Sequence, residues 1–309
     1  MRRTLSPTPN RGITVELILA YLKAASQPWP QPQLVGLSAA IGDVNFTSEW
    51  LEVGLVHQQS RPVPLVEGAG DRGGVFEHRD ASGQNQTKQL LPPDAVVQRT
   101  AKPSAQDVVV PTARQLLAAR PDLERIIIFR NTRGAAAGAA AYLAADLNLA
   151  AAATVLDALP EQDLSAVSHQ LRGCLHGGTA FHSSDLSREE RAVVERGFRD
   201  AQAGIAVLAA TTTVAAGINT PASTVIIVET EFKGLDKRAL TVAEYKNMAG
   251  RAGRLGFAEE GTAILLADNP IDRRRLFQSL RPQQPEPLRS SFNDADLTTL
   301  GPQATGSSR

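Results

Sequence analysis

The chain has 309 residues, of which 42% are hydrophobic and 21% are charged, and this composition excludes a disordered or fibrous chain and predicts a folded protein. Its 32 basic and 32 acidic residues cancel to a formal net charge of zero, so no overall field attracts it to nucleic acid or to an anionic membrane, and any binding of a polyanion has to be local. The single cysteine, Cys174, excludes an internal disulfide bond, and because neither a signal peptide nor an apolar run of ~20 residues occurs, we expect a cytoplasmic protein with no membrane contact.

The first hundred residues contain two helical patterns separated by helix breakers. Residues 12–25 carry apolar side chains at helical spacing, and three prolines between residues 28 and 32 cannot continue the helix. We expect a strand over residues 33–38 and a second helix over residues 47–53. Residues 67–103 consist mainly of Gly, Asp, Gln, Asn, Pro and charged residues, with only scattered apolar positions, so a crossover or partly mobile linker is predicted there.

From residue 111 onward, short apolar runs alternate with helical patterns. Such an alternation indicates a doubly wound α/β fold, in which a parallel sheet is covered by helices on both faces. The chain from Arg281 onward is rich in Pro, Gln, Ser and Gly, and residues 271–309 are expected to form a partly disordered tail. We expect strands at residues 125–129, near Cys174, and at residues 205–210, 224–228 and 262–267, and helices at residues 112–120, 134–147, 187–201 and 242–254.

The string NMAGRAGR, residues 247–254, holds two arginines three residues apart. On a continuous helix Arg251 and Arg254 would share one face, and the glycine before each would let that face approach a bulky anion. Paired guanidinium groups suit a polyphosphate, because each is a planar fork of donors whose charge does not titrate. The alternative is a pair of solvated arginines at a helix end. The loop TTTVAAGINTPA, residues 211–222, favours a ligand site, because it follows a buried strand at the edge where open α/β sheets bind ligands.

Six strings, in this order along the chain, resemble those of superfamily two helicases, and most closely those of the Ski-like branch. The resemblance covers about residues 11–270. It implies two RecA-like domains that clamp ATP between them and pass a single strand across their tops. The strings are LVGLSAAIGD (34–43), RPVPLVEG (61–68), IIIFRNTR (126–133), GTAFHSSDLSREERAVVERGFRD (178–200), LAATTTVAAGINTPA (208–222) and EYKNMAGRAGR (244–254).

The resemblance also implies a division of the chain. Residues 1–66 correspond to the end of a first RecA-like domain, residues 67–105 to a linker, residues 106–270 to a complete second RecA-like domain, and residues 271–309 to a partly disordered tail. The chain is expected to begin after the Asp-Glu-x-His box of the first domain and to end before a winged helix.

Individual roles are implied for residues that match the family's motifs. Arg251 and Arg254 correspond to the catalytic arginines that reach the γ-phosphate, one as an arginine finger. The positions that face the nucleotide are Gly217, Asn219, Asn247 and Gly250. The positions that contact nucleic acid are Arg130, Asn131, Thr132, Arg133, His182, Thr211, Thr212 and Thr213. The motif that couples ATP hydrolysis to strand movement is Ser38, Ala39 and Ala40.

This sequence departs from the family pattern at three of these motifs. Ala40 replaces a threonine and so loses a hydroxyl group in the coupling motif. Ser183 replaces the second of two histidines, and Asn247 replaces a glutamine that is one methylene longer. Cys174, His176 and His182 are close in sequence, but they lack a fourth ligand and the usual spacing, so we expect no metal site.

Residues 229–240 correspond to the place where a β-hairpin separates duplex strands in Ski-like helicases. Phe232 offers a ring that can stack on a terminal base pair, and Lys233, Lys237 and Arg238 offer positive charge for the diverging phosphates. The alternative is an ordinary surface loop with one aromatic residue.

A phosphate-binding P-loop is missing from this sequence. Its lysine has to follow a glycine to cap the β- and γ-phosphates, and none of the six lysines does so. ATP with Mg²⁺ would therefore be held mainly by a missing domain, for which a separate polypeptide is one candidate, and we expect no ATPase activity from the chain alone. The chain is then either the motor half of a helicase that binds single-stranded DNA or RNA, or a non-catalytic nucleic-acid-binding or regulatory module. An unrelated Rossmann-like enzyme is disfavoured, because no GxGxxG follows a strand.

Overall fold

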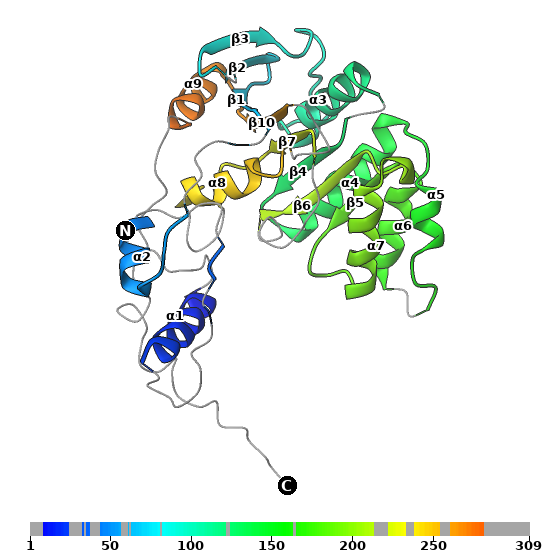
Figure 1. Cartoon of the computed structure of the whole chain (residues 1–309). Helices are drawn as coiled ribbons and strands as arrows, with labels where there is room; N and C mark the ends of the chain where they lie inside the picture. Colours follow the sequence, from blue (N-terminus) through cyan, green and yellow to red (C-terminus); the bar gives the residue numbers. More distant parts are fainter. Residues whose placement is uncertain are drawn as a thin grey trace. The chain divides into compact units, whose positions relative to one another are not determined.

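The structure is a computed structural model, and it describes residues 9–24, 33, 35–37, 44–56, 61, 63–80, 82–121, 124–162, 165–212, 222–232, 238–253 and 260–280 (Figure 1). It divides into two compact units. One contains residues 1–58 and 284–309, and the other contains residues 59–283.

The first unit contributes two described helices, α1 (Pro9–Ala24) and α2 (Val44–Leu51). The strand expected over residues 33–38 is not found at its described positions, residue 33 and residues 35–37. A strand needs a neighbour for its backbone hydrogen bonds, and the side chain of Leu37 is 93% exposed.

The second unit is built on an eight-stranded sheet in the order β3-β2-β1-β10-β7-β4-β6-β5. The pairs from β1 through β10, β7, β4 and β6 to β5 are parallel, and only β2 and β3 run antiparallel to their neighbours. The expected α/β fold with a mostly parallel sheet is therefore confirmed. The strands are β1 (Leu65–Gly70), β2 (Val75–Arg79), β3 (Asn85–Gln89), β4 (Ile126–Arg130), β5 (Thr179–His182), β6 (Val207–Thr211), β7 (Thr224–Ile227) and β10 (Gly261–Leu266).

The remaining elements of this unit are seven helices and a small hairpin among the described residues. The helices are α3 (Ala105–Ala119), α4 (Arg133–Leu147), α5 (Ala153–Asp157), α6 (Ala166–Leu175), α7 (Arg188–Arg199), α8 (Val242–Ala249) and α9 (Pro270–Ser279), with a 3₁₀ turn at Ala201–Ala203. The hairpin pairs β8 (Glu231–Phe232) with β9 (Arg238–Ala239). No described helix is both long and apolar enough to cross a membrane.

The segment expected as a linker instead contains the first three strands of the sheet. β1 pairs in parallel with β10, and β2 and β3 extend the sheet beyond β1. Gly68, one of the glycines that make this segment look like a loop, is required by packing. A Cβ atom on Gly68 would lie only 2.4 Å from the carbonyl oxygen of Glu77 in β2, so glycine permits the close approach of the two strands.

Two further elements differ from the expectations. Cys174 lies near the end of α6, and the strand expected beside it is β5, five residues farther on. The expected tail begins with α9, whose start is marked in the sequence: Asn269 caps the helix by accepting from the N–H groups of Ile271 and Asp272, and Pro270 occupies the first turn.

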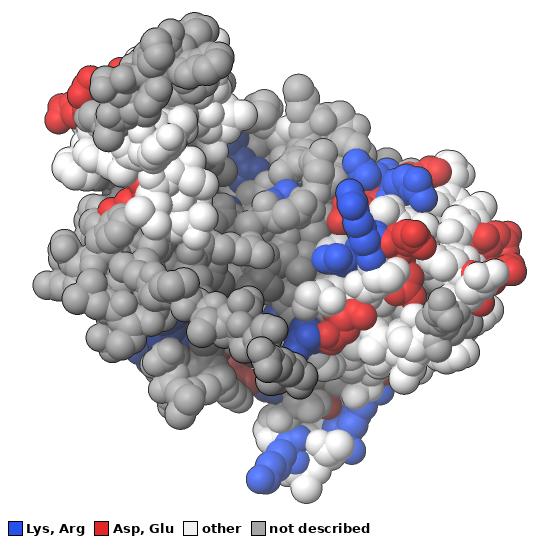
Figure 2. All heavy atoms as spheres, turned by 90° about the horizontal axis from the view of Figure 1, so that it is seen from below, with Lys and Arg blue, Asp and Glu red and all other residues white. Residues whose placement is uncertain are grey.

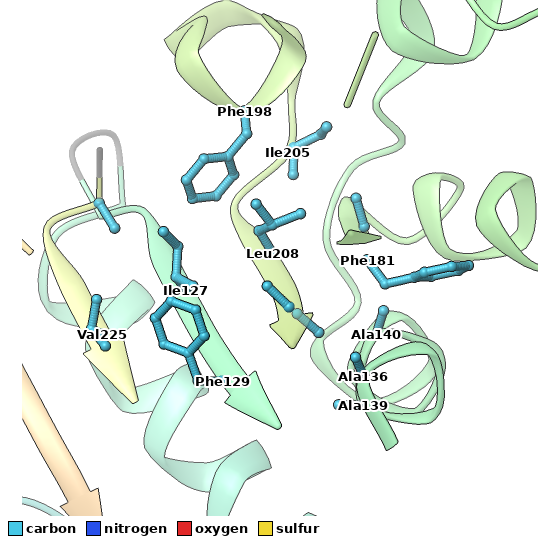
Figure 3. Close-up of a cluster of buried hydrophobic side chains, with 14 of the residues drawn as sticks. Ile127, Phe129, Ala136, Ala139, Ala140, Phe181, Phe198, Ile205, Leu208 and Val225 are labelled. Carbon is cyan, nitrogen blue, oxygen red and sulfur yellow. The ribbon is translucent and has the colours of Figure 1, made fainter. Parts of the chain in front are cut away.

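Buried side chains form a core on both faces of the sheet. Along β4, Ile126 and Ile128 belong to one cluster with α3, whereas Ile127 and Phe129 belong to another with α4, α6, α7 and α8, as expected for side chains that alternate along a strand. Figure 3 shows part of the larger cluster, with Ala136, Ala139 and Ala140 of α4 lying near Phe181 of β5. The small alanine side chains allow this helix to pack closely on the sheet.

Candidate nucleic-acid and nucleotide interface

The carboxyl ends of three neighbouring strands bring together residues predicted to contact nucleic acid. In the register of β4 and β6, Arg130 lies beside Thr211. In the register of β5 and β6, His182 lies beside Ala210, the residue before Thr211. These ends meet at one edge of the parallel sheet, the edge at which open α/β sheets bind ligands.

Arg130 is held at this edge by Glu229, which follows β7. Its Nε and Nη2 atoms lie 2.8 and 2.7 Å from Glu229 Oε1, and its Nη1 lies 3.4 Å from the carbonyl oxygen of Ala135 and 3.5 Å from the hydroxyl of Tyr142. Burial alone would lower the pKa of Arg130, but the hydrogen bond and the charge of Glu229 outweigh it and raise the pKa. The guanidinium is thus a fixed, charged part of the edge.

The loop that follows β4 presents more exposed polar groups. Asn131 donates its backbone N–H to Glu229 Oε2 at 3.2 Å and its side-chain amide to the carbonyl oxygen of Glu231 at 2.5 Å. Thr132 is exposed and caps α4 by accepting from the N–H of Ala135. Arg133 forms an exposed ion pair with Asp185, in the loop after β5.

His182 is buried rather than displayed on the surface. Its Nε2 atom lies 2.9 Å from Glu195 Oε1 of α7, and its Nδ1 atom has no hydrogen-bond partner. Burial lowers the pKa of His182, and the hydrogen bond and charge of Glu195 only partly oppose this. The imidazole is therefore neutral near pH 7 and donates from Nε2 to Glu195.

The threonine loop is described only at its start. Thr211 is the last residue of β6 and is 5% exposed, and Thr212 is half-buried. Several predicted site residues lie outside the described residues, namely Ser38, Ala39, Ala40, Thr213, Gly217, Asn219 and Arg254.

The arginine string does not continue the helix that precedes it. The predicted helix over residues 242–254 was too long, because α8 ends at Ala249, with the exposed Asn247 in its last turn and Gly250 as its C-cap. Residues 251–253, the arginine turn, come next. Arg251 accepts a hydrogen bond at its carbonyl oxygen from the N–H of Ala222, and Gly253 donates its N–H to the carbonyl oxygen of Ala222.

The arginine turn is also contacted by the segment that leads into β1. The Nη2 atom of Arg61 donates to the carbonyl oxygen of Ala252 at 2.9 Å, with a longer contact of 3.5 Å to that of Gly253. Arg61 belongs to the string RPVPLVEG, for which the sequence gives no individual role. The structure places it next to the arginine turn, 191 residues away from Ala252 in the sequence.

The glycines of this string serve the chain itself. Gly253 has a φ of +62°, and a Cβ atom there would lie 2.6 Å from the backbone nitrogen of Gly261. A Cβ atom on Gly250 would lie 2.8 Å from the carbonyl oxygen of Lys246. Both glycines thus have a packing role, in which they allow the tight turn after α8. Their expected role beside a bound anion stays a prediction.

A hairpin is present where the resemblance implied one. Glu231 pairs with Ala239 and Phe232 with Arg238, while the side chain of Phe232 lies outside the described residues. Arg238, expected to face phosphate, is engaged with Glu244 in α8 at 2.6 and 2.7 Å.

Three acidic residues at this edge were not foreseen as partners of its arginines. They are Asp185, Glu229 and Glu244, which pair with Arg133, Arg130 and Arg238. Only Glu244 carries a local signal, because Thr241 three residues earlier completes a capping box. On the face shown in Figure 2, basic and acidic side chains are interspersed over the described surface, in keeping with the zero net charge.

The region that contains this edge matches a known protein family. Residues 112–256 match the family described as "Helicase conserved C-terminal domain". The mostly parallel sheet agrees with a RecA-like helicase C-terminal domain, and the match supports a superfamily two helicase C-terminal region.

Individual proteins similar to this chain are ATP-dependent DNA helicases named Hel308. The chain is 32% identical over 290 residues to the ATP-dependent DNA helicase Hel308 of Pyrobaculum calidifontis. The matched region covers 91% of this chain and 37% of that protein. It is 32% identical over 289 residues to Hel308 of Caldivirga maquilingensis (91% and 35%) and 31% identical over 299 residues to Hel308 of Methanocella arvoryzae (93% and 37%). The chain thus spans little more than a third of the length of these relatives.

Proposed function

We propose that this chain is the C-terminal motor half of a superfamily two helicase of the Ski-like branch, which binds single-stranded nucleic acid at the carboxyl edge of its sheet and offers Arg251 and Arg254 to ATP. The observation that carries the proposal is the register that sets Arg130 beside Thr211, inside the region that matches the helicase C-terminal family. The resemblance of the arginine string to the family's catalytic motif supports the second part.

In this proposal the edge residues have two kinds of role. Thr132 and Arg133 are exposed and contact the phosphates of the strand together with the threonine loop. Arg130 and His182 act indirectly, because their polar groups bond Glu229 and Glu195 and so fix the loops around them. Few phosphates are contacted and the net charge gives no help, so binding is weak and sensitive to salt.

The nucleotide is shared between this chain and a domain that carries a P-loop. Bound ATP with Mg²⁺ supplies the γ-phosphoryl group, and the part of this chain is to hold guanidinium groups beside it. The arginine turn suits this part, because backbone hydrogen bonds to Ala222 and the contact from Arg61 fix its path. The phosphate cradle itself has to come from a longer form of this polypeptide or from another one.

An assay of ATP hydrolysis tests the proposal. We expect no activity from the chain alone, and DNA-stimulated hydrolysis when it is joined in one polypeptide to the P-loop-bearing first domain of a related helicase. Arg251→Ala and Arg254→Ala should each abolish that activity, since an arginine finger contributes ~10³–10⁵ in rate. Arg274→Ala is a matched control, because this arginine is exposed and belongs to α9 rather than to the string.

A second candidate function is a non-catalytic nucleic-acid-binding or regulatory module. The observation behind this candidate is that no lysine within these 309 residues follows a glycine, as a P-loop lysine must. Strand binding without ATP hydrolysis in the joined polypeptide would support this module, and turnover by the chain alone would contradict both candidates. The relatives are named DNA helicases, so single-stranded DNA is the first strand to test, with RNA of the same sequence as the comparison.

A further inference from the structure

The second strand of the hairpin, β9, is joined to α8 by a bidentate ion pair between Arg238 and Glu244. Arg238 Nη1 lies 2.7 Å from Glu244 Oε2, and Arg238 Nη2 lies 2.6 Å from Glu244 Oε1. The side chains are 32% and 17% exposed, so the pair is partly shielded from water. A guanidinium that meets both carboxylate oxygens fixes direction as well as distance.

The same carboxylate begins α8. Glu244 Oε2 accepts from the N–H of Thr241 at 2.9 Å, and Thr241 Oγ1 accepts from the N–H of Glu244 at 3.0 Å. This capping box is complete without Arg238. The arginine is therefore an additional contact, whose effect is to join β9 to the helix.

α8 leads directly into the arginine turn. Its last turn continues as N–H donation from Gly250 to Lys246, from Arg251 to Met248 and from Ala252 to Ala249, at 2.8 to 3.0 Å. Hydrogen-bonded backbone thus runs without a break from the first turn of this eight-residue helix to Arg251.

The entry strand of the hairpin is fastened elsewhere. Asn131 donates to the carbonyl oxygen of Glu231, and Glu229, two residues before, bonds Arg130 and Asn131. The N–H of Leu240 closes the base of the hairpin by donating to the carbonyl oxygen of Thr230 at 2.8 Å. One strand of the hairpin, β8, is therefore anchored at the proposed strand-binding loop, and the other, β9, is anchored at α8, the helix that leads into the arginine turn.

We propose that Arg238 and Glu244 are positioning residues that make the hairpin and the arginine turn move together. This inference rests on the proposed function, in which the hairpin meets a duplex junction and the turn serves ATP. Nucleic acid that pushes on the hairpin then shifts Arg251 through β9, the ion pair and α8.

Amide hydrogen exchange on the full 309-residue chain tests the ion pair. Arg238→Gln removes the fork, and Glu244→Gln removes the charge but keeps a capping box, because glutamine also serves there. We expect each change to speed exchange of the backbone amides of residues 238–240 about tenfold, and the double variant to speed it no further, because one interaction is lost in all three. Unchanged exchange, or additive effects of the two substitutions, would overturn the proposal.

A forked DNA duplex tests the transmission. In the unsubstituted chain, binding of the fork should slow exchange at residues 251–253. In Arg238→Gln, at a concentration of forked DNA that saturates the variant, this slowing should vanish. Arg238→Lys should fall between, since lysine keeps the charge but lacks the planar pair of donors. Equal slowing in the variant would contradict transmission. A chain that binds no fork would contradict the proposed function and the transmission with it, whereas exchange in the free chain would still decide the role of the ion pair.

Discussion

Tyr245 in α8 donates its hydroxyl hydrogen to Glu67 in β1, with 2.9 Å between the two oxygens. The two residues are 178 positions apart, and Glu67 lies in the segment that looks like a linker in the sequence. Burial, reinforced by the negative charge of Glu67, holds the pKa of Tyr245 well above its ordinary value, so the phenol stays protonated and remains a donor. β1 is thus part of the support of the helix that leads to the arginine turn.

Removal of this hydroxyl should weaken the fold. We expect Tyr245→Phe to lower the free energy of unfolding by about 1–2 kcal/mol, because it deletes a buried hydrogen bond to a carboxylate. Urea unfolding measures the change. Tyr142→Phe is the matched control and should cost less, because the hydroxyl of Tyr142 has only a 3.5 Å contact with Arg130. Equal stability of Tyr245→Phe and the unsubstituted chain would contradict this role.

The two arginines of the loop after β4 should respond differently to substitution. In the pair of Arg130 with Glu229 the side chains are 12% and 22% exposed, so Arg130→Ala leaves a partly buried carboxylate and should cost about 2–3 kcal/mol of stability. The side chain of Arg133 is 60% exposed, so Arg133→Ala should cost less than about 1 kcal/mol. The comparison is made by urea unfolding of both variants. Equal losses would show that burial of the pair does not decide its contribution.

Gly253 should tolerate no side chain. Its positive φ and the 2.6 Å approach of a Cβ atom to Gly261 predict a loss of more than about 2 kcal/mol for Gly253→Ala. Gly83→Ala separates the two causes, because Gly83 has a φ of +83° but open space around its Cβ position, and it should cost only about 1 kcal/mol. Thermal or urea unfolding measures both, and similar losses would mean that crowding at Gly261 has no effect.

The free energy of unfolding should depend on pH through the ionisation of Glu244. Burial alone would raise the pKa of Glu244, but the hydrogen bonds and charge of Arg238, with the N–H of Thr241, lower it below its ordinary value of 4.5. The folded state therefore binds this proton less tightly than the unfolded state, so the stabilisation is present above the ordinary pKa and is lost as pH falls through the lowered one. The difference in unfolding free energy between the unsubstituted chain and Arg238→Gln should shrink from about pH 7 to about pH 3. A difference that stays constant with pH would contradict this assignment.

The central sheet could be predicted because its strands are short runs of buried apolar residues between helices. The run at residues 125–129 becomes β4, which starts one residue later and ends at Arg130. The strands β1 to β3 could not be predicted in the same way, since Gly68 reads as a turn residue until the close approach of Glu77 is known. The helix predicted over residues 242–254 was also too long, because helical spacing continues beyond Ala249 in the sequence. The chain turns there and forms a bridge between Ala252 and Ala222, which are distant in sequence, so no local pattern signals it.

The sequence predicted which residues belong to the candidate site, but it did not predict which side chains pair with them. The motifs located Arg130, Thr211 and Arg251, and the strand order explains why the first two lie side by side. Their acidic partners could not be inferred, because Glu229 is 99 residues from Arg130 and no local pattern links them. The contact of Arg61 with the arginine turn is likewise a product of the fold alone.

The most direct test of strand binding is fluorescence anisotropy of a labelled single-stranded oligonucleotide titrated with the chain. Between about 50 and 200 mM salt we expect affinity to fall steeply, and in Arg133→Ala the slope of log affinity against log salt should decrease by about 0.7, the value for one phosphate contact on a single strand. Arg274→Ala on α9 should leave both affinity and slope unchanged. Absence of binding at low salt, or equal slopes for Arg133→Ala and Arg274→Ala, would contradict the placement of the nucleic-acid strand at the carboxyl edge of the sheet.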